Sequence, residues 1–379
     1  MIDYNSIRSK YINADCGFYS VGNDVYLHKS QALLQATESK LPVLFHFNEP
    51  EYSAFAWQQE PTETLEELYV TRAREIRDTH DYIIACYSGG IDSQSMIDTF
   101  VDNGILLDHV VSYGSWNRHV DKLHNINNQE VMIAGRDTIK KITQMGIKFT
   151  HLNMLDTIDT SFQDSEWILR SGGGGAHLAP YTELLEQSTI KFLTKFLRPG
   201  KKVCLLWGKE KPNIKLIEGT FYVEFNDRSL LDMLVNSNNY PFKHVMFYSS
   251  NSTTKLMAKQ IHGIINYLEK NYTAKEISKF LAYTSTHSTD YTSIVNKICY
   301  KKFPIFSVGK TTSLIRPMKW QWFWSDTSTQ QFKIWNGAVI DLHRSVALNL
   351  KTKFDPVARR MTFGTLYNQY AVRKIKNLV

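Results

Sequence analysis

The chain has 379 residues, 43% of them hydrophobic and 21% charged, so it can bury the cores of two domains or of one enlarged α/β domain. No apolar run is long enough to cross a bilayer, which argues against a membrane protein. The net charge of +7 suits an anionic ligand or a nucleic acid, although a basic protein without such a ligand has the same balance.

The first 18 residues include acidic side chains and no apolar stretch, so we expect no signal peptide. The 4 cysteines form no CxxC pair, which argues against a disulfide scaffold, a zinc ribbon or a cysteine-ligated cluster. Together these features predict a reducing, cytoplasmic location.

The N-terminal part of the chain has mixed signals. The pattern predicts a strand at 25–29, a helix at 30–39, a strand at 42–47 and a turn at 48–50.

A strong helix signal follows at 62–79. Thr62 or Thr64 can cap its acidic first turn, and three arginines lie toward its end, as the helix dipole favours. Strands and helices then alternate: strands at 82–87, 108–112, 148–152 and 203–207, with helices at 91–101, 127–145 and 181–197. This alternation predicts an α/β fold with a parallel, doubly wound sheet.

Beyond about residue 225 the pattern changes. A hairpin at 215–225 turns at Glu218 and Gly219, and helices are predicted at 253–270 and 273–282. We therefore divide the chain into an N-terminal α/β extension (1–60), a ligand-binding α/β domain (61–225) and a largely helical region for substrate recognition (226–379).

The segment Ser88–Ser93 follows the first buried strand and opens the next helix. The first turn of a helix presents unpaired N–H groups, and its dipole favours an anion. Gly89 and Gly90 let the backbone approach phosphate oxygens, and the two serines add hydroxyl donors. Asp92 would be repelled by phosphate alone, so we expect it to orient the loop or to hold Mg²⁺. An ordinary capped strand–turn–helix is the alternative.

The sequence S-G-G-I-D-S after an apolar strand resembles the signature of the PP-loop (N-type) ATP pyrophosphatases. This family includes the synthetase domain of asparagine synthetase, GMP and NAD synthetases, and the lysidine and thiouridine enzymes of tRNA. The likeness covers about residues 60–215, and Leu65 to Phe100 also resembles uncharacterised phage-type members. It implies an adenine-nucleotide α-hydrolase-like fold. It also implies an ATP- and Mg²⁺-dependent ligase that cleaves ATP between the α and β phosphates and adenylates a carbonyl.

The resemblance also assigns residues. ATP and pyrophosphate would contact Ser88, Gly89, Gly90, Ile91, Asp92 and Ser93. The adenine or ribose would lie beside Ser112, Tyr113, Gly114 and Gly208. Catalysis would involve Asp92 together with Lys209 or Lys211, which would neutralise the leaving pyrophosphate, while Asp92 and Glu210 would hold Mg²⁺. A solvated Lys-Glu-Lys turn is the alternative for 209–211.

Departures from the family's sequence pattern exclude some of its reactions. Ile2 stands where a glutaminase of the N-terminal-nucleophile kind needs cysteine, and Cys86 and Cys204 lie in predicted buried strands, where thiols are inert. The reaction that remains is amide-like C–N bond formation on a small metabolite or nucleobase. One alternative substrate is a nucleic acid, docked on the basic C-terminus with Trp320 and Trp322. Another alternative is a non-catalytic ATP sensor. The sequence predicts neither a general base nor an oligomeric state.

Overall fold

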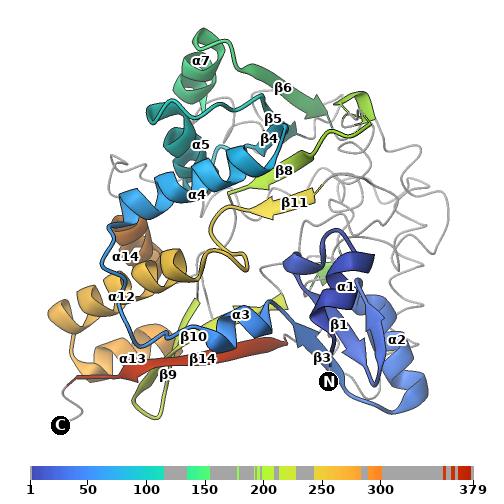
Figure 1. The fold of residues 1–379 in the computed structure, drawn as a ribbon. Coiled ribbons are helices and arrows are strands. Elements are labelled where there is room, and N and C mark those ends of the chain that lie inside the picture. The colour runs from blue at the N-terminus through green and yellow to red at the C-terminus, as the bar shows by residue number, and fades with distance from the viewer. Residues whose placement is uncertain are drawn as a thin grey trace.

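The computed structural model describes residues 2–114, 135–153, 177–178, 192, 194–196, 199–208, 213–227, 243–282, 289–300, 353–355, 360–362 and 366–376. The fold is mixed α/β and is built around a five-stranded parallel sheet (Figure 1). No helix within these ranges is long and apolar enough to span a bilayer.

The central sheet has the spatial order β11-β8-β4-β5-β6, and every neighbouring pair is parallel. Its strands are β4 (Tyr82–Cys86), β5 (His109–Gly114), β6 (Lys148–Asn153), β8 (Val203–Trp207) and β11 (Lys243–Met246). Every residue of β8 is buried, as its continuous apolar sequence predicts. The four strands expected from the sequence are confirmed, and β11 is a fifth that the pattern did not reveal.

The order of the strands reverses in the middle of the sheet. The chain moves outward from β4 through β5 to β6, then returns to the other side of β4 with β8 and β11. In open α/β sheets, ligands bind outside the carboxyl ends of the two strands at which such a reversal occurs. Here those strands are β4 and β8.

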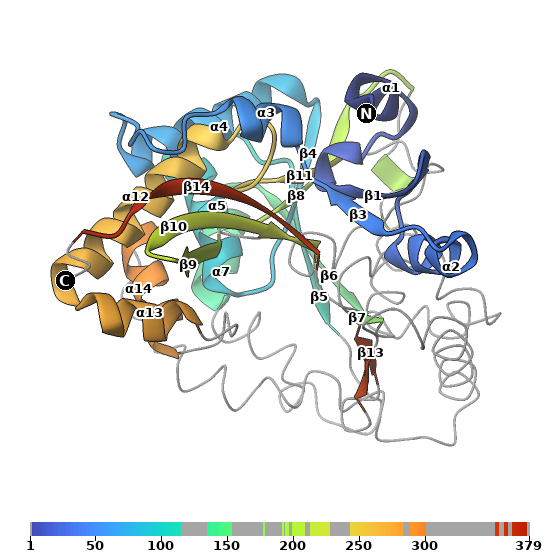
Figure 2. The same cartoon turned by 90° about the horizontal axis from the view of Figure 1, so that it is seen from below.

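Three helices lie together on one side of the central sheet (Figure 2). They are α4 (Leu65–Thr79), α5 (Ile91–Asp102) and α7 (Arg136–Gln144). Helix α4 begins with a capping box, in which the Thr64 hydroxyl accepts from the Glu67 N–H at 3.2 Å and the Glu67 carboxylate accepts from the Thr64 N–H at 2.8 Å. The predicted cap at Thr64 is confirmed. Most of the predicted helix at 181–197 lies outside the described residues, apart from the short turn η4 (Thr194–Phe196).

Residues before α4 form an N-terminal unit. It consists of α1 (Tyr4–Lys10), the turn η1 (Ala14–Cys16), β1 (Phe18–Val21), β2 (Asp24–Tyr26), α2 (Lys29–Ser39), β3 (Val43–His46) and α3 (Glu49–Ala54). The three strands form an antiparallel sheet in the order β2-β1-β3. The predicted turn at 48–50 is wrong, because α3 begins there. Pro50 fits the first helical turn, where a missing N–H costs no hydrogen bond.

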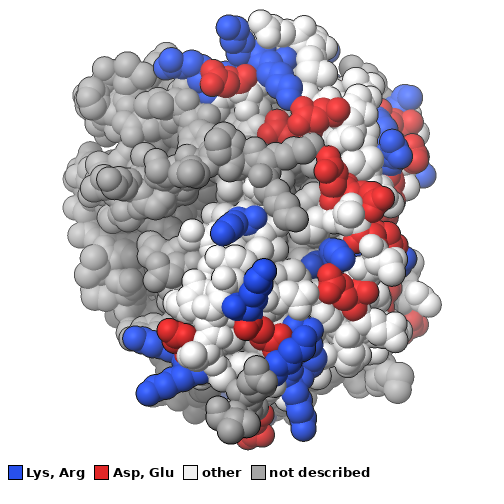
Figure 3. Space-filling model, turned by 90° about the vertical axis from the view of Figure 1, so that its left-hand side faces the viewer, with Lys and Arg blue, Asp and Glu red and all other residues white. Residues whose placement is uncertain are grey.

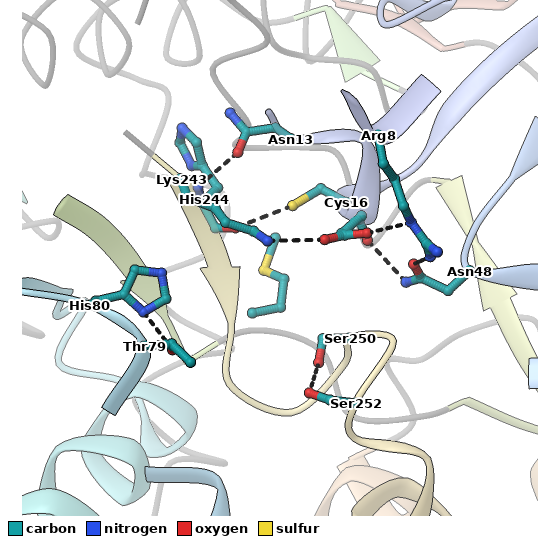
Figure 4. Close-up of polar contacts among 12 residues, drawn as sticks. Arg8, Asn13, Cys16, Asn48, Thr79, His80, Lys243, His244, Ser250 and Ser252 are labelled. Carbon is teal, nitrogen blue, oxygen red and sulfur yellow. Dashed lines mark hydrogen bonds and ion pairs between the residues drawn. The ribbon is translucent and has the colours of Figure 1, made fainter. Parts of the chain in front are cut away.

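The N-terminal unit covers the outer strand β11 (Figure 4). The Asn13 side chain accepts a hydrogen bond from the His244 backbone N–H at 2.8 Å, and the Cys16 thiol donates to the His244 carbonyl at 3.6 Å. Lys243 pairs with Asp15 at 3.1 Å. The unpaired backbone groups of an edge strand can pair with a strand of another chain. These side chains therefore protect the edge of the sheet.

The His244 ring is buried and stacks on Trp207. The Trp207 indole N–H donates to His244 Nδ1 at 2.9 Å, and because an indole N–H can only donate, Nδ1 carries no proton. Burial lowers the pKa of His244 to about 3. The folded protein therefore holds this histidine neutral, whereas the unfolded chain protonates it near an ordinary pKa of 6.5.

We expect the protein to lose stability in mild acid. Below the unfolded pKa the unfolded chain binds a proton that folded His244 does not, so stability falls from about pH 6.5 toward the folded pKa of about 3. For His244 alone the loss between pH 7.5 and pH 5.5 is about 1 kcal/mol. Urea unfolding of the wild type and of His244→Asn, whose amide oxygen can still accept from Trp207, measures this share. An equal pH dependence in both proteins would contradict it.

A second, antiparallel sheet has the order β14-β10-β9. Strands β9 (Asn213–Ile217) and β10 (Thr220–Asn226) form the hairpin expected from the sequence. Its two turn residues, Glu218 and Gly219, have φ angles of 48° and 73°. Strand β14 (Tyr367–Lys374) returns from the far end of the sequence to pair with β10.

After residue 226 the described chain is both helical and extended. The helices are α12 (Thr254–Asn271), α13 (Ala274–Ala282) and α14 (Thr289–Cys299). Besides β11 and β14, a small antiparallel sheet joins β7 (His177–Leu178), β13 (Arg360–Thr362) and β12 (Lys353–Asp355). The helices at 253–270 and 273–282 are confirmed, whereas β11 and β14 interrupt what the sequence predicted as a largely helical region.

Candidate functional site

The loop between β4 and α5 lies at the point where the strand order reverses. The backbone N–H of Tyr87 still bonds to the Val111 carbonyl of β5 at 2.7 Å, so the chain leaves the sheet only at Ser88. Gly89 has φ +77°, a conformation that favours glycine, and α5 begins two residues later at Ile91. Ser88 is exposed and Gly89 to Asp92 are half-buried, so the loop is accessible from solvent.

Hydrogen bonds between its two serines close the loop. The buried Ser93 hydroxyl donates to the Gly90 carbonyl at 3.0 Å and accepts from the Ser88 N–H at 3.2 Å. The Ser88 hydroxyl lies 3.1 Å from that of Ser93 and accepts from the Gly90 N–H at 3.2 Å. Ser93 therefore fixes the shape of the loop, whereas Ser88 presents a hydroxyl at the surface.

Gly208, directly after β8, packs against the start of α5. A Cβ atom at this position would lie 2.6 Å from the Ser93 Cα and 2.9 Å from both the Asp92 carbonyl oxygen and the Ser93 nitrogen. All three atoms belong to the backbone and cannot rotate away. The end of β8 therefore lies against the first turn of α5, which brings together two segments that the sequence predicted for the site.

Two tyrosines from beyond β11 hold Asp92. The Tyr300 hydroxyl donates to the Asp92 carboxylate, and the Tyr248 hydroxyl donates to the Asp92 backbone carbonyl at 2.8 Å. Burial, together with the charge of Asp92, raises the pKa of both phenols well above their usual value. Both hydroxyls therefore stay protonated and act as donors. Sequence reasoning missed these residues, because nothing near them in the chain signals contact with the loop.

Gln94 connects the loop to the helices around it. Its side-chain oxygen accepts from the Tyr87 hydroxyl and from the Thr138 hydroxyl of α7, each at 2.6 Å. Its amide nitrogen donates to Asp98 one turn further along α5 at 3.0 Å. The residue after strand β4 is thus joined to helices α5 and α7 within one network next to the loop.

The other residues predicted for the site lie at the ends of β5 and β8. Ser112 is fully buried, and its hydroxyl lies 2.6 Å from Nδ1 of His151 on β6. Tyr113 and Gly114 are the last two residues of β5 and pair with the end of β6. Lys209, Glu210 and Lys211 follow Gly208 in the chain and lie outside the described residues.

A chain of hydrogen bonds in the N-terminal unit has the order of a hydrolytic triad. The Ser20 hydroxyl lies 2.8 Å from His46 Nε2, and His46 Nδ1 lies 2.9 Å from the Glu49 carboxylate, which also accepts from Tyr4 at 2.7 Å. Yet Ser20 is only 1% exposed. A nucleophile must reach its substrate, so we interpret these hydrogen bonds as a structural polar network that joins β1, β3 and α3.

Charged side chains of both signs are interspersed on the described part of the face in Figure 3. Several cations of the described residues are paired with carboxylates, among them Lys255 with Glu63 at 2.7 Å and Lys259 with Glu60 at 2.9 Å. The positive excess of the sequence is therefore not gathered into one basic patch on the described part of this face.

Comparison with known proteins gives no family assignment. The sequence matches no protein-family model, and no curated protein is similar enough to count as a relative.

Proposed function

We propose that the chain binds ATP on the loop Ser88–Ser93 and cleaves it between the α and β phosphates to adenylate a substrate. The observation that supports this most is the position of the loop. It lies at the carboxyl end of β4, at the start of α5 and at the reversal of strand order. A glycine-containing loop at that place, opening a helix, is a physically favourable site for phosphate groups.

Within this proposal each part of the loop has a role. The first N–H groups of α5 and its dipole attract the β and γ phosphates, which leave together as pyrophosphate. Gly89 allows the backbone to turn toward them, and the exposed Ser88 hydroxyl adds a donor. Ser93 keeps the loop in shape through its bond to the Gly90 carbonyl.

The proposed Mg²⁺ ion would bind at Asp92. Among the described residues no group of three or more histidine, cysteine, aspartate or glutamate side chains is arranged to hold a metal. Mg²⁺ does not need such a group, because it commonly takes one or two carboxylates and completes its shell with substrate phosphates and water. The ion would neutralise charge on the leaving pyrophosphate. Glu210, Lys209 and Lys211 remain candidates because they directly follow Gly208, which touches the loop.

We also propose that the fold is adenine-nucleotide α-hydrolase-like and that the chain is a PP-loop protein. Their support is the S-G-G-I-D-S sequence together with the order of the parallel strands. The adenylated group would be a carbonyl of a small metabolite or nucleobase, and an amine or ammonia would displace AMP. Tyr113 and Gly114, at the end of β5, are the candidates for the adenine or ribose side.

We expect Mg-ATP to give AMP and pyrophosphate when the protein is incubated with the correct substrate pool. Phosphorus NMR of the wild type, run with pooled metabolites, nucleosides and tRNA, would detect both products and identify the substrate class. Asp92→Asn and Ser88→Ala should lower turnover by about tenfold or more, since each removes a contact with phosphate or its ion. Ser39→Ala, on the exposed end of α2, is the control and should leave turnover unchanged.

Other products would point elsewhere. ADP and phosphate would overturn the proposed site of cleavage. ATP binding without turnover in any pool would favour a nucleotide sensor. Turnover only with tRNA would favour a nucleic-acid substrate. The sequence feature behind that last alternative, the basic aromatic stretch around Trp320 and Trp322, lies outside the described residues.

A further inference from the structure

We propose that Tyr300 is a positioning residue of the nucleotide site. Its hydroxyl holds the Asp92 carboxylate, so that binding of Mg-nucleotide depends on the position of helix α14. This inference rests on the proposed function. Tyr300 follows the last residue of α14, Cys299, and lies more than two hundred positions from Asp92 in the sequence.

The end of α14 is held in place by contacts with two other helices. A Cβ atom on Gly263 of α12 would lie 2.9 Å from the Ile298 side chain, so α12 and α14 cross closely there. The Tyr69 hydroxyl of α4 donates to the Cys299 carbonyl at 3.0 Å and accepts from the Gln260 amide of α12 at 2.9 Å. The backbone that carries Tyr300 is therefore fixed before its side chain meets the loop.

Asp92 is held at two points. Tyr300 bonds its carboxylate and Tyr248 its backbone carbonyl, and the two tyrosine rings pack edge to face with centroids 6.0 Å apart. Both tyrosines are buried, at 4% and 0% exposure. The carboxylate can therefore turn only if its hydrogen bond to a buried tyrosine breaks, which would leave that phenol without this partner away from water.

The chemistry of the donor matters as much as its position. A lysine or arginine here would neutralise the carboxylate and weaken its attraction for a cation. A phenol is neutral, so it orients Asp92 and leaves the negative charge in place. Partners that orient a metal-binding carboxylate in this way commonly change metal affinity by about 10- to 100-fold when removed.

The test compares Tyr300→Phe with Tyr291→Phe. Tyr291 is a buried tyrosine of α14 and lies nine residues before Tyr300, so its substitution controls for loss of a buried phenol from this part of the chain. Binding of a fluorescent ATP analogue is measured as Mg²⁺ is titrated. We expect Tyr300→Phe to raise the Mg²⁺ concentration for half-maximal binding by about 10- to 100-fold, and Tyr291→Phe to leave it near the wild-type value. An unchanged Mg²⁺ dependence in Tyr300→Phe overturns the inference.

A second measurement needs no nucleotide. Hydrogen exchange of the ligand-free protein, read on peptides covering residues 87–96, should be faster in Tyr300→Phe than in Tyr291→Phe, because only the first variant releases the loop. Equal exchange in the two variants overturns the positioning role. If the wild type binds no nucleotide while exchange still differs, the proposed function fails and the contact between Tyr300 and the loop stands.

Discussion

Replacing Gly208 by alanine should lower the stability of the fold and remove the nucleotide binding that we propose for the loop Ser88–Ser93. The new Cβ would lie within 2.9 Å of three backbone atoms at the start of α5. Neither side can yield by rotating a side chain, so the end of β8 or the first turn of α5 must move. Overpacking of this kind costs about 1–3 kcal/mol. A displacement of about 1 Å in the groups that position a ligand can reduce function about a hundredfold.

Gly90→Ala provides the matched control for stability. Gly90 lies in the same loop, its φ of −81° suits any residue, and a Cβ there would meet only the Ser88 hydroxyl at 3.3 Å. Thermal unfolding should therefore show a clear loss for Gly208→Ala and a small one for Gly90→Ala. Titration with an ATP analogue completes the test. Wild-type melting and wild-type affinity in Gly208→Ala would show that β8 and α5 are not in tight contact.

Lys29→Met should destabilise the protein by about 3–5 kcal/mol, the usual cost of leaving one partner of a buried ion pair without the other. Lys29 of α2 pairs with Asp227 just after β10, and both side chains are buried. Asp227 also accepts from the backbone N–H of Leu366 at 3.1 Å. One carboxylate thus joins the N-terminal unit to both strands at one end of the β10–β14 pairing.

The double variant Lys29→Met/Asp227→Asn separates the charge from the packing. It removes the unpaired carboxylate that the single substitution leaves buried, so it should recover much of the lost stability. Urea unfolding of the two single variants and the double variant gives the coupling between the residues. If Lys29→Met alone unfolds at the wild-type urea concentration, the pair makes no net contribution to stability.

The parts of the fold that the sequence predicts well are those encoded locally. Strand β8 is a continuous apolar run, α4 begins with a capping box, and the β9–β10 hairpin turns at Glu218 and Gly219. In each case neighbours in the sequence determine the structure, because burial on both faces, end capping and positive φ all leave a mark within a few residues.

The parts that were missed depend on distant contacts. Strand β11 contains Lys243 and His244 in four residues, and Asn13 and Cys16 of the N-terminal unit, far away in the sequence, cover its outer edge. At the candidate site, the loop itself was visible in the sequence. The contact of Tyr300 with Asp92 was not visible, because a tyrosine after a helix gives no local sign of the aspartate that it contacts.

The pairing of β10 with β14 has a consequence for how the protein is made. Thr220 pairs with Lys374 and Asn226 with Tyr367, so β10 leaves the ribosome well over a hundred residues before its partner. Bringing such distant segments together is slow, because closing a long loop costs conformational entropy before any contact compensates for it. Meanwhile one edge of β10 is exposed to other chains. We therefore expect the antiparallel sheet to form after synthesis of the central sheet, and nascent chains halted before residue 367 to be prone to aggregate.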